Sequence, residues 1–110
     1  MISRMDLRER FMKDPVERRL GSIASDLVRL ANLAKIGNAG KEAFNNVLDE
    51  VKFFTEWSAR DLHPEAQEKI LNLQRVMVSW ISSSSPERAM NIEHEARNWS
   101  KDILSVSGLL

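Results

Sequence analysis

The sequence predicts an all-α protein: an antiparallel up-down-up-down four-helix bundle with a short N-terminal arm or extra helical turn. Two observations support this fold class. Apolar residues recur at alternating steps of three and four through four segments of similar length, which is the spacing of one helix face. Each of the three prolines stands where one of these segments would begin. Because the connections between segments are short, neighbouring helices are most easily packed antiparallel.

The first helix is expected at about residues 15–36. Asp14 supplies a carboxylate for the N-cap, Pro15 takes the first helical position, and Glu17 follows three residues after the cap. Gly37 then provides a stop signal. The apolar face of this helix comprises Val16, Leu20, Ile23, Leu27, Leu30 and Ala34.

Three further helices are expected at about residues 41–61, 64–82 and 86–107. His63 and Pro64 separate the first two of these, because the residue before a proline is disfavoured in the helical region. The core faces of the three helices comprise Phe44, Val47, Leu48, Val51, Phe54, Ser58 and Leu62; Ala66, Ile70, Leu73, Met77 and Trp80; and Ala89, Ile92, Ala96, Trp99, Ile103 and Val106.

Composition limits the organisation and the classes of partner. A chain of 110 residues with 43% hydrophobic content can bury one core, so residues 1–13 are expected as an arm, flexible or docked, and residues 14–110 as the bundle. Sixteen basic and sixteen acidic residues cancel, so nucleic acid is not an expected partner and an anionic membrane would not attract the chain. The absence of cysteine excludes disulfides and thiolate metal sites and fits the cytoplasm, which is the expected location. No signal peptide and no apolar run of about 18 residues is present, so no membrane span is expected.

The segment Ser82 to Ser85 places four consecutive serines between the last two predicted helices. Hydroxyl groups suit a helix boundary because they hydrogen-bond to nearby backbone groups. A serine nucleophile needs a base that a third group holds in place, and no Gly-rich elbow accompanies these serines. We therefore expect Ser85 to cap the last helix rather than to react.

Arg88 and His94, with five residues between them, form an Arg-x(4-6)-His pattern. This pattern resembles the motif of the HEPN superfamily, helical proteins that include dimeric ribonucleases and nucleotidyltransferase partners. The resemblance covers seven residues and implies an RNA-cleaving pair in a groove between two protomers. The family usually has a polar residue after the arginine, whereas Ala89 stands there in this chain. On a regular helix six residues subtend about 240°, so the two side chains would point apart.

Neither histidine is expected to bind a metal ion or a cofactor. Metal sites in helical bundles commonly use inward-facing Glu-x-x-His pairs. Here Asn91 stands three residues before His94, and Arg60 stands three residues before His63. No metal site and no cofactor is therefore predicted.

Apolar residues outside the core faces give the clearest functional indication. The second helix carries two aromatic residues four apart, and the first and third helices each carry an aliphatic pair. Helix rotation, or the N-terminal arm through Phe11 and Met12, would cover some of these flanks. Large exposed apolar patches on soluble monomers nevertheless usually mark contact sites. The predicted interface residues are Phe53, Trp57, Leu33, Ile36, Leu71 and Val78.

Together these observations predict a non-enzymatic helical-bundle module for protein–protein interaction, which forms a homodimer or docks on another protein. Two alternatives stay open. One is a HEPN-like ribonuclease or toxin–antitoxin component that uses Arg88 and His94, and the other is a small-molecule sensor that holds a ligand between its helices. No catalytic residue is assigned, because the fold alone does not choose among these functions.

Overall fold

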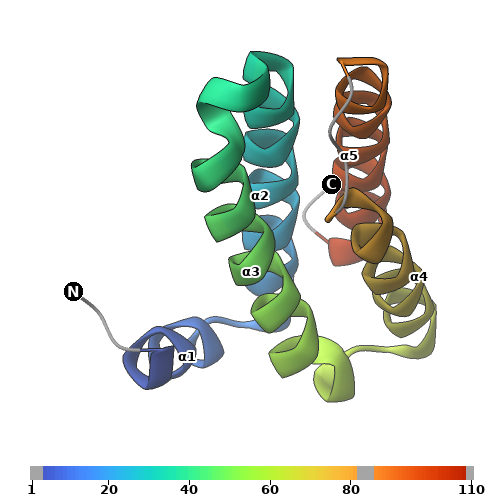
Figure 1. Ribbon diagram of the computed structural model, residues 1–110. Coiled ribbons are helices and arrows are strands. Elements are labelled where there is room, and N and C mark those ends of the chain that lie inside the picture. Colours follow the sequence, from blue (N-terminus) through green and yellow to red (C-terminus); the bar gives the residue numbers. More distant parts are fainter. Residues whose placement is uncertain (1–3, 82–85, 109–110) are drawn as a thin grey trace.

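The computed structural model describes residues 4–81 and 86–108 (Figure 1). Throughout these residues the chain is helical and without strands, which confirms the all-α prediction. No helix among them combines the length and the hydropathy that crossing a bilayer requires. The elements, with η denoting 3₁₀ helices, are α1 (Arg4–Lys13), α2 (Val16–Ile36), η1 (Gly37–Gly40), α3 (Lys41–Ser58), η2 (Ala59–Asp61), α4 (Pro64–Trp80) and α5 (Pro86–Ser107).

The four long helices, α2 to α5, pack around a common core. α2 contacts both α3 and α5, and α4 contacts α5. In Figure 1, η1 joins α2 to α3 at the upper end of the molecule, where α5 also begins, and η2 leads from α3 toward α4 at the lower end. The shorter α1 lies at the lower end beside α3. The upper end of the molecule in Figure 1 is therefore formed by η1 and the start of α5, and the lower end by α1 and η2.

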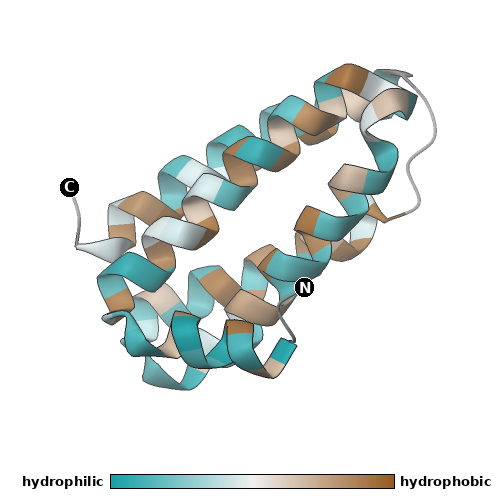
Figure 2. Cartoon of the chain, turned by 90° about the vertical axis from the view of Figure 1, so that its left-hand side faces the viewer, coloured by the Kyte–Doolittle hydropathy of each residue, from teal (hydrophilic) through white to brown (hydrophobic). Residues whose placement is uncertain are grey.

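The core consists largely of the residues that the apolar periodicity assigned to it, together with Phe11, Ala24 and Ala31, which it did not assign. All predicted core positions of the first helix are buried except Val16, which is half-buried. The predicted positions of the second and third helices are all buried, and in α5 only Ala89 and Trp99 are half-buried. Figure 2 shows how hydrophobic and hydrophilic residues alternate along each helix. One apolar face per helix is thus enough to form a single shared core.

α2 begins one residue later than the sequence predicts. Pro15 has an extended backbone (φ −62°, ψ 158°) and is the N-cap, without a side-chain capping hydrogen bond. Its carbonyl oxygen accepts hydrogen bonds from the backbone N–H groups of Arg18 (3.0 Å) and Arg19 (3.1 Å). The prediction that Asp14 is the N-cap is therefore wrong, because the Pro15 carbonyl is the first acceptor and the helix starts at Val16. The carbonyl of Asp14 instead accepts a hydrogen bond from Arg19 Nε at 2.9 Å.

Two glycines close the turn between α2 and α3. Gly37 has φ 79° and its N–H donates to the Ala34 carbonyl, which confirms the predicted stop. Gly40 is buried, and a Cβ atom added to it would lie 2.8 Å from the carbonyl oxygen of Leu33. A side chain at Gly40 would therefore force the end of α2 away from the start of α3.

The boundary between η2 and α4 is formed by a histidine and a proline. His63 is the N-cap of α4, and its Nδ1 accepts a hydrogen bond from the Ala66 N–H at 3.3 Å, with Pro64 in the first turn. This confirms the predicted start at residue 64, while the preceding helix ends its α-helical part at Ser58 and tightens into η2. The predicted cap at Ser85 lies outside the described residues.

The predicted N-terminal arm contains the ten-residue helix α1, which packs against α3. Phe11 is only 5% exposed, and its ring stacks on Phe54 with centroids 4.0 Å apart. Arg19 holds the connection to α2, because its guanidinium donates to the Met12 carbonyl (3.2 Å) and pairs with Asp61 (2.7 Å). The aromatic stack and the buried arginine thus help to hold α1, together with Leu7 and Met12, which pack against the core.

Candidate functional site

The aromatic pair that the sequence places on the interface lies beside α1. Phe53 and Trp57 are both half-buried and stack with ring centroids 5.6 Å apart. The guanidinium of Arg4 lies 4.1 Å from the centroid of the Phe53 ring, and the ring centroids of Phe11 and Trp57 are 6.1 Å apart. α1 therefore already contacts both aromatic residues, and less of their surface is open to a partner than the sequence alone indicated.

The aliphatic residues of α4 and its C-cap form a more exposed face. Leu71, Val78 and Ile81 are 47%, 65% and 55% exposed. Steps of seven and three residues place them on one side of the helix, where Glu68 and Arg75 also lie. The sequence reasoning named Leu71 and Val78 but missed Ile81, although its step of three from Val78 indicates the same face. At the end of α2, Ile36 is likewise exposed, whereas Leu33 packs against the core.

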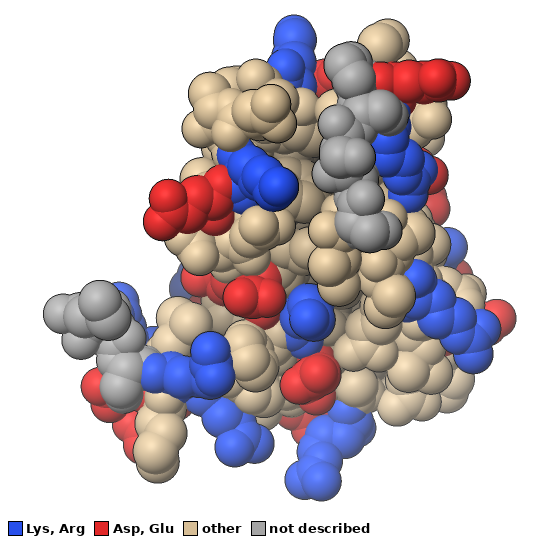
Figure 3. All heavy atoms as spheres, in the orientation of Figure 1, with Lys and Arg blue, Asp and Glu red and all other residues tan. Residues whose placement is uncertain are grey.

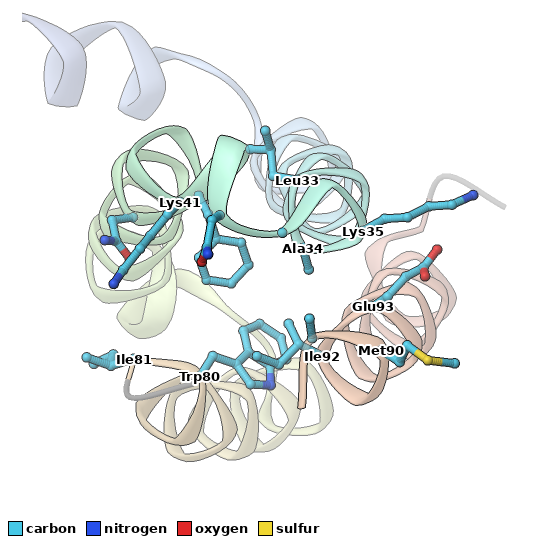
Figure 4. A pocket seen from close by; sticks show the side chains of 14 residues that line it. Leu33, Ala34, Lys35, Lys41, Trp80, Ile81, Met90, Ile92 and Glu93 are labelled. Carbon is cyan, nitrogen blue, oxygen red and sulfur yellow. The ribbon is translucent and has the colours of Figure 1, made fainter. Parts of the chain in front are cut away.

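A cavity of about 430 Å³ opens at the end of the molecule that carries η1. Segments of α2, η1, α3, α4 and α5 line it. Its inner wall is apolar: Ala34, Phe44, Trp80 and Ile92 are all buried core residues. In Figure 4, Ala34 faces Trp80 and Ile92 across the cavity. The cavity thus reaches the core at this end of the molecule.

Polar side chains surround the mouth of this cavity. They are the cations Lys35 and Lys41, the amides Asn38 and Asn45, and the carboxylate Glu93. Figure 4 shows the two lysines on opposite sides of the opening and Glu93 on the side of Lys35. The site therefore combines an apolar wall with a rim that contains hydrogen-bond donors and two positive charges.

A hydrogen-bonded network fixes the wall that α4 and α5 contribute. The indole N–H of Trp80 donates to Glu95 Oε2 at 2.6 Å. Arg88 pairs with Glu95 at 3.5 Å and donates to the carbonyl and the hydroxyl oxygen of Ser79 at 3.3 and 2.9 Å. His94, the other residue of the HEPN-like pattern, lies further along the regular helix α5. In the structure Arg88 thus links α4 to α5.

The sequence reasoning missed a buried acidic residue on α2. The side chain of Asp26 is 8% exposed, and Arg29 donates to it at 3.1 Å. Burial, followed by a hydrogen bond with Glu50 and the negative charge of Glu50, raises the pKa of Asp26 to about 8, although Arg29 acts to lower it. A signal was present in the sequence, since Asp26 stands three residues after Ile23 and four before Leu30, at the spacing of the core face.

On the rest of the surface that the described residues form, no further group of side chains assigns a function. Within residues 4–81 and 86–108, no group of three or more His, Asp or Glu side chains could hold a metal ion. On the face in Figure 3, basic and acidic side chains are interspersed. A scan against protein-family models matches no family, and searches of the curated proteins and of the solved structures return no match.

Proposed function

We propose that this chain is a non-enzymatic interaction module, an antiparallel up-down-up-down four-helix bundle that forms a homodimer through the exposed face of α4. The observation that supports this function is the row of Leu71, Val78 and Ile81, three large aliphatic side chains in contact with water. Burial of one such side chain contributes roughly 1.5–3 kcal/mol. A two-fold axis places the same face against itself, which is the commonest way to form a closed oligomer.

The charges on this face fit one particular pairing. If two copies of α4 cross antiparallel with the axis beside Leu71, Glu68 of each copy lies opposite Arg75 of the other. Symmetry makes this contact twice. Leu71 packs against its counterpart, and Val78 of each copy lies opposite Pro64 at the start of α4 in the other copy. Neither Glu68 nor Arg75 takes part in the ion pairs found between described residues. Both charges therefore remain available for contacts across the interface.

Sedimentation velocity over a concentration series tests this function. We expect the wild type to be dimeric at micromolar concentration and Leu71→Ser with Val78→Ser to be monomeric, with unchanged far-UV circular dichroism. Val28→Ser is the matched control, because Val28 is an exposed aliphatic residue on α2 and should leave the dimer intact. A wild type that stays monomeric throughout, or a double variant that still dimerises, would contradict the proposal.

The other predicted interface residues take a secondary place in this proposal. Phe53 and Trp57 contact α1, and Leu33 packs against the core, so of this group only Ile36 is an open aliphatic side chain. An interface through these residues stays a prediction, as does a cytoplasmic location, which rests on the absence of cysteine.

A small-molecule sensor is the second candidate function, and the cavity at the η1 end is the observation that favours it. Its volume of about 430 Å³ lies within the range of small-molecule sites in proteins, roughly 300–1,000 Å³. The ribonuclease alternative has less support, because Arg88 is bound to Ser79 and Glu95 on α4 and α5.

A further inference from the structure

We infer that the cavity at the η1 end binds a small apolar carboxylate, such as an aromatic or branched-chain monocarboxylic acid. The apolar part of the ligand would lie against Trp80 and Phe44, and its carboxylate would lie at the mouth between Lys35 and Lys41. This inference rests on the second candidate function, the small-molecule sensor, and names the chemical class of its ligand.

The inner wall determines the apolar part of the ligand. Trp80 and Ile92 are each 1% exposed and Phe44 is 8% exposed, so the wall is made of side chains that belong to the core. The Trp80 ring is held by its hydrogen bond to Glu95, which uses the indole N–H and leaves the carbon surface of the ring for packing. Small-molecule sites are mostly apolar with a few polar groups that orient the ligand. A phenyl or branched aliphatic group fits such a wall better than a sugar or a nucleotide.

The rim determines the charge of the ligand. Lys35 and Lys41 stand on opposite sides of the opening, and in Figure 4 both side chains extend outward from it. Because a lysine side chain is flexible, rotation about its bonds would bring each ammonium group toward an anion at the mouth. The carboxylate at the rim, Glu93, is engaged by Arg97, whose Nη2 and Nε lie 2.9 and 3.2 Å from Glu93 Oε2. Because this ion pair offsets the charge of Glu93, the two lysines give the opening a positive balance that favours an anion.

The amides at the mouth add hydrogen-bond donors that suit a carboxylate. Asn38 and Asn45 each carry two N–H donors and line the opening with the lysines. A single carboxylate has two oxygens and accepts about four hydrogen bonds. The two amides alone thus offer four N–H donors, as many as one carboxylate accepts, and the two lysine ammonium groups add further donors.

A series of three compounds with the same apolar part tests the charge preference. The probes are 3-phenylpropanoate, the neutral 3-phenylpropanamide and the cationic 3-phenylpropan-1-amine, titrated into ¹⁵N-labelled full-length protein. The readout is the indole N–H resonance of Trp80 in NMR spectra, which reports on the inner wall directly. We expect the carboxylate to bind about two- to fivefold more tightly than the amide, as is typical of a partly exposed charge contact, and the amine to bind most weakly.

Variants separate the two parts of the site. Lys35→Gln with Lys41→Gln should reduce carboxylate affinity to that of the amide and leave amide binding unchanged. Lys101→Gln is the control, since Lys101 is an exposed lysine of α5 that does not line the cavity. Ala89→Phe, which places a ring in the cavity, should abolish binding of both compounds.

The outcomes distinguish the sensor function from the ligand class that rests on it. Carboxylate binding that depends on both lysines and disappears with Ala89→Phe supports the site and its ligand class. If the amide binds as tightly as the carboxylate, and Ala89→Phe removes both, the sensor function stands and the anion assignment is wrong. If none of the three probes shifts the Trp80 resonance at millimolar concentration, the sensor function and the ligand class both fail.

Discussion

Asp26 holds a carboxyl group in the protein interior beside a second carboxylate. Burial, followed by the hydrogen bond and charge of Glu50, raises its pKa to about 8, whereas the ordinary value is 3.8. Between these two pH values the folded protein keeps a proton that the unfolded chain releases. The contribution of Asp26 to stability is therefore fully present below about pH 4 and is lost as the pH rises toward 8.

Replacing Asp26 with asparagine should remove this pH dependence. The new amide would keep an oxygen for Arg29 and gain an N–H that donates to Glu50, so no buried polar partner is lost. We expect Asp26→Asn to be more stable than the wild type at pH 8, by on the order of 1–3 kcal/mol, with the difference shrinking toward pH 4. Urea unfolding at several pH values measures this difference in the free energy of unfolding.

The control for this experiment is Asp49→Asn, which changes an exposed carboxylate on α3. Its stability should follow that of the wild type across the pH range. Unfolding curves of wild type and Asp26→Asn that stay parallel from pH 4 to pH 8 would show that Asp26 ionises normally in the folded protein.

At the scale of single elements, α1 depends on a small number of contacts. Phe11 is the one buried residue in its ten-residue length within the described structure, and it stacks on Phe54 with an interplanar angle of 7°. A helix this short is marginal on its own in water. The position of α1 beside Trp57 is therefore set by the Phe11 contact together with the arginine that holds the following connection.

Phe11→Ala should release α1 from α3. The loss of a buried phenylalanine costs roughly 3–5 kcal/mol, which sets the expected drop in stability near the lower value because α1 can separate without opening the bundle. The release of α1 should be accompanied by faster hydrogen exchange at the Trp57 indole N–H, which NMR can follow.

Met5→Ala is the matched control for this change, because Met5 lies on the same helix and is 77% exposed. Removal of residues 1–13 should expose Trp57 as Phe11→Ala does. Protection of the Trp57 indole that survives both changes would show that α1 does not cover it.

The fold could be predicted further than the sites because helix faces are local properties and contacts between faces are not. Steps of three and four assigned most large apolar residues that are buried in α2 to α5, and the exposure of Val78 follows from its place outside that face. The periodicity did not assign the buried residues Arg19, Ala24, Asp26, Ala31, Thr55, Ser100 and Ser107. The stack of Phe11 on Phe54 and the pairing of Asp26 with Glu50 join residues far apart in the sequence. Both depend on how two helices are rotated against each other, which no single helix reveals.

The cavity could not be predicted from the sequence for the same reason. Its lining comes from five elements, and its residues look like ordinary core and surface positions when each helix is considered alone. The cavity forms where α2, η1 and α3 pack against the ends of α4 and α5, so no single helix predicts it.

At the scale of the whole molecule, the proposed antiparallel pairing of α4 in a homodimer makes a prediction about charge. Glu68→Arg alone, or Arg75→Glu alone, would place like charges opposite each other and should weaken the dimer about tenfold or more. The double variant restores opposite charges in the reverse order and should dimerise like the wild type. Sedimentation equilibrium compares the four proteins. Single variants that dimerise normally, or a double variant weaker than either, would exclude this register.

The docking of α1 also bears on the order in which the chain becomes ordered during synthesis. Phe11 packs on Phe54, and Arg19 pairs with Asp61, so both anchors of the N-terminal segment wait for partners that leave the ribosome later. Until α3 and η2 have emerged, the aromatic ring and the guanidinium stay in water. α1 is therefore made before the segments that hold it, and it cannot attach until α3 and η2 are available.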